Sequence, residues 1–394
     1  MRLHVAIPMA GHSRRFKEAG YNTTKALLPV GNKLMIEHVF DMFDTDLCTF
    51  HLVINEDQVQ DHPKIVDKLK SFAPAVTVTV IPPHELGPVF SVLQIKSLPD
   101  DVPLIVSYCD FSVVWDFRKF LYQIEGADGA VPAFKDFHPA SFGDTFYAYM
   151  RTDGEGFLKE LREKHSFTDE RYKEPASAGI YYFRDVATYR YYAERQMQRP
   201  KMELPEAYVS LLFNEMVADG LSVKVPLVKK FICLGTPSDY EQFNFWYEYF
   251  QQEKTGVPKI PSKACQTTRI PMAGRGSRFE KFGYRVDKPM INLGGEPMVA
   301  HAIRSHPEQD KWIFVTLRDA VAKHRVNRIF DDLKLDYEMV TVEETTSGQA
   351  ATCLLASDKI DDEAELFISS CDYCMFFDAD EWASVLEDSS IDGA

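Results

Sequence analysis

The sequence contains no run of about 20 consecutive apolar residues, which is the length that a membrane-spanning helix needs. The apolar stretch near the start is broken by Pro8 and is too short for the hydrophobic region of a signal peptide. We therefore expect a soluble, cytoplasmic protein that has no membrane partner.

Positive charge is also scarce. The 44 Lys and Arg residues are outnumbered by 59 Asp and Glu residues, and the formal net charge is -15. Binding to the nucleic-acid backbone depends on clustered cations that neutralise phosphates. No nucleic-acid partner is therefore expected, and any phosphate chemistry must depend on a few local basic side chains.

The cysteines do not form the pattern of a disulfide-bonded protein. There are seven of them, an odd number, and they are scattered through the chain, so we expect reduced thiols. Cys371 and Cys374 form a Cys-x-x-Cys pair, but no second pair of zinc ligands stands at comparable spacing.

One stretch of the sequence occurs twice. The 394 residues are 45% hydrophobic, which is enough for two or more domains with their own cores. Residues 7–16 read IPMAGHSRRF, and residues 270–279, which lie 263 positions later, read IPMAGRGSRF. A Gly-Tyr pair and then a lysine, Lys25 or Lys288, follow at the same spacing in both places.

Two further matches keep nearly the same offset. Asp110 and Asp372 each follow a cysteine, and an Asp-Gly-Ala triplet occurs at 128–130 and again at 392–394. A constant offset over so many residues indicates a tandem duplication. We expect a complete domain at 1–250, a linker at 251–268 and the N-terminal half of a second domain at 269–394.

Both copies alternate short apolar runs with helix-like segments. The expected strands are Leu3–Ile7, Phe50–Ile54, Val76–Ile81 and Leu104–Ser107 in the first copy, and Trp312–Thr316, Tyr337–Thr341 and Leu366–Ser369 in the second. The clearest expected helices are Met35–Phe43 and Val89–Ser97. Unbroken apolar strands that alternate with helices indicate a sheet covered on both faces. The predicted fold class is α/β, doubly wound, with a mostly parallel sheet.

The repeated motif follows the first expected strand of each copy. In open α/β sheets, ligands bind at the carboxyl ends of the strands, where a glycine loop can turn backbone N–H groups towards phosphate oxygens. Arg15 and Arg278 each supply a guanidinium that can grip a triphosphate, and Lys25 and Lys288 add a mobile charge. The recurrence of loop, arginine and lysine in the same order favours a phosphate site in each copy.

A carboxylate follows another expected strand in each copy. Asp110 comes after Leu104–Ser107, and Asp372 comes after Leu366–Ser369. An aspartate at the end of a strand beside a triphosphate could hold Mg²⁺, which prefers oxygen ligands. The alternative is a helix or turn cap, where aspartate is common.

These features resemble a known family. The run 271–279, followed by Lys288 and Pro289, resembles the signature loop of the nucleotidyltransferases that activate sugar 1-phosphates or related phosphorylated groups. It differs from the dinucleotide fingerprint and the Walker loop, since an arginine follows the glycines and no Gly-Lys-Ser/Thr occurs. The resemblance implies a Rossmann-like nucleotidyltransferase fold in tandem copies.

The resemblance also implies roles for the matching residues. Binding of the nucleoside triphosphate would involve Ala10, Gly11, Ser13 and Gly87 in the first copy, and Ala273, Gly274, Gly276 and Gly348 in the second. The catalytic residues would include Arg15 and Arg278, which hold the triphosphate, and Lys25 and Lys288, which stabilise charge during transfer. Asp110 and Asp372 would bind Mg²⁺. Lys164 and Gly179 would bind the phosphorylated acceptor. As alternatives, Gly87 and Gly348 could be ordinary loop glycines before a helix, and Lys164 could belong to an exposed Glu-Lys pair on a helix.

The first copy departs from the family pattern at three positions. Ser13 stands where the second copy has Gly276, so a side chain occupies the phosphate loop. Ala26 replaces the proline that follows Lys288. Cys233 stands where many members of the family have a second magnesium aspartate, and a neutral thiol is a poor Mg²⁺ ligand.

The function implied is transfer of a nucleoside monophosphate to a sugar 1-phosphate or related acceptor, with release of pyrophosphate, for surface polysaccharide precursors. Two alternatives stay open. A non-catalytic nucleotide-binding or regulatory module would explain Ser13 and Cys233. A glycosyltransferase with a related fold would be expected to carry an Asp-x-Asp motif, whereas Asp110 is followed by Phe111 and Ser112.

Overall fold

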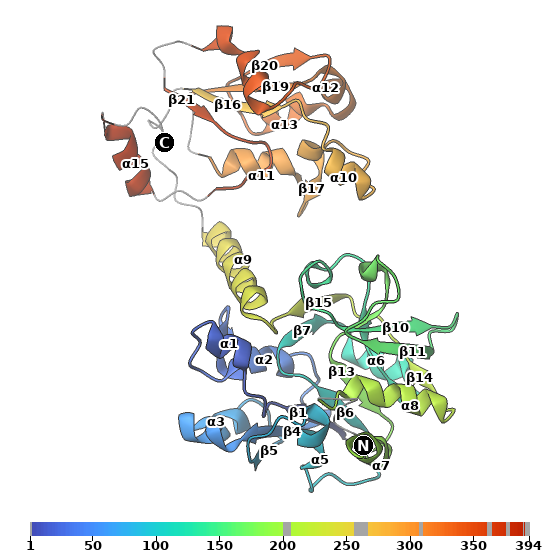
Figure 1. The fold of residues 1–394 in the computed structure, drawn as a ribbon. Coiled ribbons are helices and arrows are strands. Elements are labelled where there is room, and N and C mark those ends of the chain that lie inside the picture. Colours follow the sequence, from blue (N-terminus) through green and yellow to red (C-terminus); the bar gives the residue numbers. More distant parts are fainter. Residues whose placement is uncertain are drawn as a thin grey trace. The chain divides into compact units, whose positions relative to one another are not determined.

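The computed structural model describes residues 2–199, 206–255, 267–306, 310–360, 365–375, 379–388 and 390 (Figure 1). The chain divides into two compact units, Met1–Gln251 and Gln252–Ala394. Residues 251–255 end helix α9 (Pro237–Thr255), and 267–268 begin strand β16 (Thr267–Met272). The rest of the expected linker, and the Asp-Gly-Ala triplet at 392–394, lie outside the described residues.

The first unit is built on a seven-stranded sheet in the order β14-β8-β13-β6-β1-β4-β5. These strands are β1 (Leu3–Pro8), β4 (Cys48–Asn55), β5 (Val76–Ile81), β6 (Leu104–Ser107), β8 (Gly129–Ala130), β13 (Ile180–Phe183) and β14 (Val223–Lys224). Strand β1 pairs in parallel with both β4 and β6, whereas β13 runs antiparallel to β6 and β8. The predicted α/β class with a mostly parallel sheet is confirmed, with β13 as the antiparallel exception.

Helices cover both faces of this sheet. The core on one face contains side chains from α2 (Met35–Phe40), α4 (Ile65–Lys70) and α6 (Phe117–Gln123). The core on the other face contains side chains from α5 (Pro88–Leu93), α7 (Val186–Met197) and α8 (Leu212–Ala218). Short helices α1 (Arg14–Glu18) and α3 (Glu56–Asp61) follow β1 and β4.

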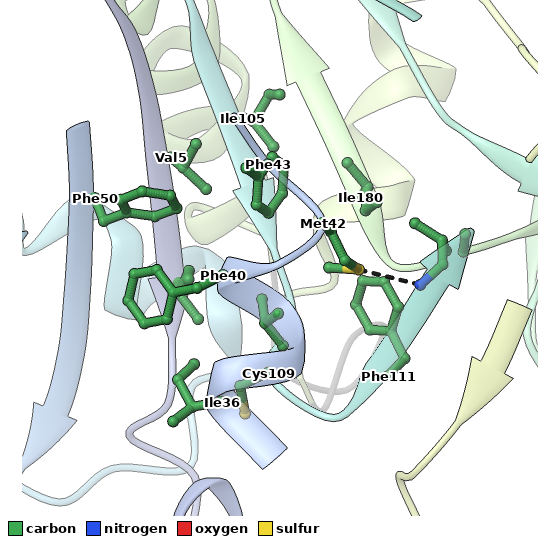
Figure 2. Close-up of a cluster of buried hydrophobic side chains, with 14 of the residues drawn as sticks. Val5, Ile36, Phe40, Met42, Phe43, Phe50, Ile105, Cys109, Phe111 and Ile180 are labelled. Atoms are coloured by element: carbon green, nitrogen blue, oxygen red, sulfur yellow. Dashed lines mark hydrogen bonds between the residues drawn. The ribbon is translucent and has the colours of Figure 1, made fainter. Parts of the chain in front are cut away.

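Aromatic side chains fill the first of these cores. Figure 2 shows Phe40, Phe43 and Phe50 packed around Val5 and Ile105 of the central strands. The dashed contact in the figure is the backbone N–H of residue 113 donating to the sulfur of Met42 at 3.2 Å. Because β1, β4 and β6 are buried on both faces, their sequences are apolar runs and not alternating patterns.

A second half of this unit is built mostly from residues that follow the repeated stretch, with β7 inside that stretch. It contains a four-stranded antiparallel sheet, in the order β11-β10-β12-β9, and a pair β7-β15. The strands are β7 (Phe111–Val114), β9 (Ala133–Phe134), β10 (Ala148–Thr152), β11 (Leu158–Glu163), β12 (Ala176–Ser177) and β15 (Lys230–Cys233). The Glu163-Lys164 pair lies at the end of β11, so it does not belong to a helix.

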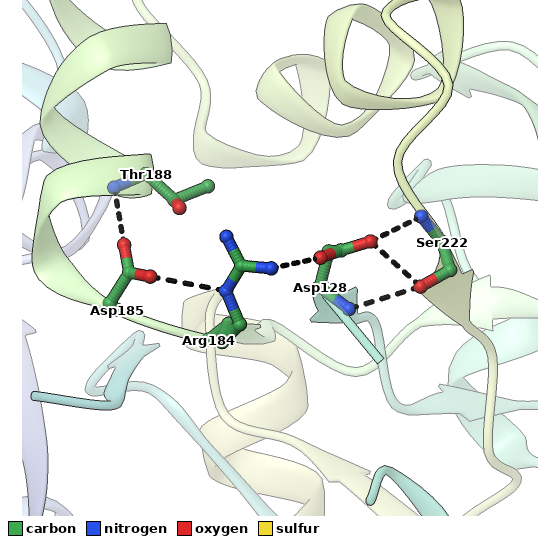
Figure 3. A network of polar contacts seen from close by, with 5 residues as sticks. All are labelled: Asp128, Arg184, Asp185, Thr188 and Ser222. Atoms are coloured by element: carbon green, nitrogen blue, oxygen red, sulfur yellow. Dashed lines mark hydrogen bonds and ion pairs between the residues drawn. The ribbon is translucent and has the colours of Figure 1, made fainter. Parts of the chain in front are cut away.

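The first Asp-Gly-Ala triplet secures the edge of the large sheet. Asp128 accepts hydrogen bonds from the backbone N–H and the hydroxyl of Ser222, both at 2.8 Å, and forms an ion pair with Arg184 at 2.5 Å (Figure 3). Arg184 also contacts Asp185, which caps α7 by accepting from the backbone N–H of Thr188. This recurring aspartate therefore holds β8, β13 and β14 together in the first unit.

The second unit repeats the parallel part of the first. Its sheet has the order β20-β19-β16-β21, with β19 (Lys311–Leu317), β20 (Tyr337–Val342) and β21 (Leu366–Ile368), and every pair is parallel. The order matches β5-β4-β1-β6. The described helices are α10 (Ser277–Lys281), α11 (Met298–Arg304), α12 (Arg318–His324), α13 (Val326–Asp332), α14 (Gln349–Leu354) and α15 (Ala379–Glu387).

Among the described residues, no helix is long and apolar enough to cross a membrane.

A pair of histidines lies inside the first sheet. His4 Nδ1 and His51 Nε2 are 2.8 Å apart, and His51 Nδ1 is 2.8 Å from the hydroxyl of Thr77. His51 is buried, and burial, with a smaller contribution from His4, lowers the pKa of His51 to about 4, while burial also lowers the pKa of His4. The fold therefore favours the neutral rings.

We predict that the first unit loses stability as the pH falls from 6.5, the ordinary histidine value, towards 4. The unfolded chain binds protons in this interval before the folded chain does, and the loss should reach about 3 kcal/mol. Denaturant unfolding measured between pH 7 and pH 4 tests this. His51→Asn should flatten the dependence, whereas the same change at the exposed His165 should leave it intact.

Candidate active site

A pocket of about 560 Å³ lies at the carboxyl ends of β1 and β6 in the first unit. It is lined by most of the residues that the sequence singled out: Ala10, Gly11, Ser13, Arg15, Lys25, Gly87 and Asp110. The parallel pairing of β1 with β6 places the loop after β1 beside the aspartate after β6. The arginine, the lysine and the aspartate therefore share one cleft.

The second unit has a pocket at the equivalent place, of about 1030 Å³. Its lining includes Ala273, Gly274, Gly276, Arg278, Lys288, Gly348 and Asp372. These residues follow β16 and β21, which pair in parallel as β1 and β6 do. The structure thus brings the repeated motif together twice, once in each unit.

An ion pair closes the base of each pocket. Lys25 Nζ lies 2.7 Å from Asp110 Oδ2, and the two side chains are 19% and 23% exposed. Burial alone would lower the pKa of Lys25, but Asp110 outweighs this and the net pKa is raised. In the second unit Lys288 pairs with Asp372, and the pKa of Asp372 is lowered by Lys288 and Ser370 against the opposing effect of burial. Lys25 is therefore cationic beside Asp110, and Asp372 is anionic beside Lys288.

The phosphate loops keep one shape despite the serine in the first copy. Ser13 has a φ of 52° and Gly276 a φ of 67°, so both are left-handed and both precede a short helix. The left-handed conformation of a non-glycine residue such as Ser13 lowers the stability of the fold by about 1 kcal/mol. A Cβ at Gly276 would lie 2.7 Å from the Cβ of Lys288, so the second loop is the less tolerant of a side chain.

Gly87 is held by a close backbone approach. Its φ is 87°, and a Cβ placed on it would lie 2.7 Å from the nitrogen and 2.8 Å from the oxygen of Ala207. Gly348 has no neighbouring atom within 4 Å of its ideal Cβ. The first copy therefore needs glycine here for packing, whereas the second does not.

Cys233 lies beside the aspartate of the first pocket. Strand β15 pairs with β7, and the N–H of Leu234 donates to the backbone oxygen of Asp110 at 2.9 Å. The thiol contacts Asp239 Oδ2 at 3.2 Å, and burial, with a smaller contribution from Asp239, raises the pKa of Cys233 to about 12. The side chain is a neutral thiol near pH 7 and is not a thiolate ligand.

The two expected acceptor residues lie outside the lining of the first pocket. Lys164 donates to the hydroxyl of Tyr208 at 2.7 Å. Gly179 has a φ of 78°, and a Cβ on it would lie 3.0 Å from the ring of Phe111. Packing against Phe111 is therefore reason enough for glycine at 179, and an acceptor role for either residue stays a prediction.

Other lining residues were not identified from the sequence: His12, Arg14, His84, Glu85, Tyr108, Glu206, Tyr208 and Gly235. Arg14 and Glu85 form an exposed ion pair at 2.6 Å. Tyr108 could have been found, because it directly precedes Cys109 and Asp110. Glu206 and Tyr208 could not, because they lie outside the stretch of sequence in which the two copies can be compared.

The donor set limits how a metal could bind. Among the described residues, no three His, Cys, Asp or Glu side chains are grouped so that they could hold a metal ion. Asp372 is the carboxylate among the lining residues of the second pocket, whereas Glu85 and Glu206 line the first pocket together with Asp110. Mg²⁺ in phosphate sites often uses one or two carboxylates together with phosphate oxygens and water. The residues therefore fit a Mg²⁺ that arrives with a triphosphate, and they do not form a protein-only cage.

A family model matches the segments that carry the two glycine loops. The model of the MobA-like NTP transferase domain matches residues 5–168 and 270–393, which are the two copies of the repeat. The chain belongs to this family. The matched segments confirm the tandem arrangement, and no curated protein sequence matches the chain.

Solved structures share the fold at low sequence identity. A nucleoside-diphosphate-sugar pyrophosphorylase from Vibrio cholerae RC9 is 20% identical with a TM-score of 0.51, over 61% of this chain and 99% of that one. A putative glucose-1-phosphate thymidylyltransferase from Bacillus anthracis is 18% identical with a TM-score of 0.50, over 62% of this chain and 95% of that one. At such identities the likeness shows the fold alone.

We predict that Gly87→Ala destabilises the first unit by at least about 1–2 kcal/mol, because the new Cβ meets the backbone of Ala207 at a left-handed φ. Chemical denaturation measures the loss. Gly348→Ala is the matched control and should change the stability of the second unit little, since no atom lies near its Cβ. Equal effects of the two substitutions would contradict the packing argument.

Proposed function

We propose that the protein is a nucleotidyltransferase that moves a nucleoside monophosphate from a nucleoside triphosphate to a phosphorylated acceptor. One observation carries the proposal: in each unit, a glycine loop, an arginine, a lysine and an aspartate line a single pocket at the carboxyl ends of two parallel strands. This arrangement gathers cations in a protein whose net charge is -15.

The reaction would be an in-line displacement. An oxygen of the acceptor phosphate attacks the α-phosphorus, a new P–O bond forms, and the bond to the oxygen bridging the α- and β-phosphates breaks. The electron pair leaves with pyrophosphate. The protein needs no covalent intermediate, and its contribution is to position the reactants and stabilise charge.

Three side chains of the first pocket would do most of this work. Arg15 would hold the departing pyrophosphate, and Lys25 would stabilise the charge at the α-phosphate. Asp110 would hold Mg²⁺, which neutralises phosphate charge when bound. Since Lys25 and Asp110 pair at 2.7 Å, Lys25 would need to turn from the carboxylate towards the phosphate when the triphosphate enters.

The loop glycines support a ligand in the pockets. Gly11 and Gly274 line them, and no atom lies within 4 Å of an ideal Cβ at either position. Neither glycine has a φ in the left-handed range. Neither packing nor backbone conformation therefore requires glycine at these two positions. The close approach of a phosphate to the backbone would require it.

We further propose a sugar 1-phosphate as the acceptor and surface polysaccharide precursors as the product class. The names of the two solved structures, a nucleoside-diphosphate-sugar pyrophosphorylase and a putative glucose-1-phosphate thymidylyltransferase, support a sugar phosphate. The location that we propose is the cytoplasm, where nucleoside triphosphates are available.

We predict that Asp110→Ala abolishes Mg²⁺-dependent release of pyrophosphate, because the first pocket loses the carboxylate that pairs with Lys25 and would hold the metal. The assay combines a panel of nucleoside triphosphates with sugar 1-phosphates and measures pyrophosphate. Asp372→Ala is the matched control in the second unit and should leave that release unchanged. Unchanged release in the Asp110 variant would reject the assignment of the first pocket as the active one.

The neutral thiol of Cys233 beside Asp110 favours one alternative, a nucleotide-binding module without catalysis. The two functions differ in a simple measurement. A binding module would raise the melting temperature in the presence of a triphosphate but would release no pyrophosphate with any acceptor. An enzyme would show both effects, and we expect both.

A further inference from the structure

Two polar contacts join the end of strand β11 to the segment that precedes α8. The hydroxyl of Ser210 donates to Glu163 Oε2 at 2.5 Å, and Lys164 Nζ donates to the hydroxyl of Tyr208 at 2.7 Å. Glu163 and Lys164 are adjacent in the sequence, and their partners Ser210 and Tyr208 are two positions apart. The contacts therefore fix the two segments relative to each other.

The backbone of Lys164 is held by a hydrogen bond, and its side chain lies against Tyr208. Its φ is 59°, a left-handed conformation that costs a lysine about 1 kcal/mol, and its N–H donates to the oxygen of Tyr147 at 2.9 Å. The ammonium lies 4.8 Å from the centroid of the Tyr208 ring. Lys164 is exposed and does not line the pocket.

Tyr208, in contrast, does line the pocket that contains Arg15 and Asp110. Its carbonyl accepts from Gln196 Nε2 at 3.1 Å, and the residues on either side of it are buried. The preceding residue, Ala207, exchanges backbone hydrogen bonds with Leu86 and Val89, which flank Gly87. Tyr208 is thus held next to the loop that would receive the nucleotide.

The contact with Lys164 leaves the phenol proton for another acceptor. Lys164 occupies a lone pair of the hydroxyl, so the O–H must donate elsewhere. The hydrogen bond that Lys164 donates to Tyr208 raises the pKa of Lys164 against the effect of burial. Burial raises the pKa of Tyr208, so the pair is an ammonium and a neutral phenol. A cation that donates to a hydroxyl strengthens the hydrogen bond that the hydroxyl makes onward. Glu206, a carboxylate that also lines the pocket, adds to burial in raising the pKa of Tyr208.

We propose that Tyr208 is the group that positions the acceptor in the first unit: its hydroxyl donates to an oxygen of the acceptor phosphate, and Lys164 acts through it. The inference rests on the proposed function, and it assigns Lys164 an indirect role in place of the direct contact that the family resemblance implies.

The test compares Tyr208→Phe, which keeps the ring and its packing, with wild type in the full chain. Calorimetric titration with glucose, galactose and mannose 1-phosphates should show binding weakened by about tenfold or more, as for a lost hydrogen bond to a charged group. Triphosphate affinity and melting temperature should not change. Tyr172→Phe is the matched control, since Lys173 lies over that ring at 5.6 Å and neither residue lines the pocket.

The double variant separates the indirect role from a direct one. If Lys164 acts through Tyr208, Lys164→Met weakens binding in wild type but adds little to Tyr208→Phe. Full additivity, an unchanged affinity in Tyr208→Phe, or no binding of any probe by wild type would each overturn the proposal. Tyr208-dependent binding without pyrophosphate release would instead reject the proposed catalysis and leave this inference intact.

Discussion

The parallel pairing of β1 with β6 is the constraint on which the site depends. Because both strands end at the same edge of the sheet, the loop that carries Arg15 and the aspartate that follows β6 meet, although almost 100 residues separate them. Strands β16 and β21 repeat the arrangement around Arg278 and Asp372. The rest of each unit covers or extends this pair of strands.

The first pocket gathers basic side chains in a protein that is acidic overall. A general attraction for phosphate is excluded by the net charge of -15, so binding must come from a few cations held in place. The ion pair of Lys25 with Asp110 stores one such cation next to the carboxylate that a magnesium triphosphate would need. Lys25 and Asp110 therefore neutralise each other in the first pocket.

The two copies differ where the second half of the fold meets the first. Gly87 is constrained by the backbone of Ala207, and Tyr208 reaches the first pocket from the same segment. In the described part of the second unit, no segment takes this place, and Gly348 stands in open space. The loop itself differs little, since Ser13 and Gly276 are both left-handed. The two copies thus have the same motif in their pockets and differ in the segment that packs beside it.

The sequence by itself determined the duplication, the α/β class and the parallel strands. It also determined the glycine loop with its arginine, lysine and aspartate. Apolar runs and a repeated motif are local patterns, so they can be recognised without knowing which residues are in contact. The sequence did not determine the antiparallel strand β13, the antiparallel second sheet, or the inclusion of Glu206 and Tyr208 in the pocket. Their short strands carry no distinctive pattern, and the segment around 206–208 has no repeat partner. Only tertiary structure decided these features, because they depend on which distant segments pack together and on the backbone approach of Ala207 to Gly87.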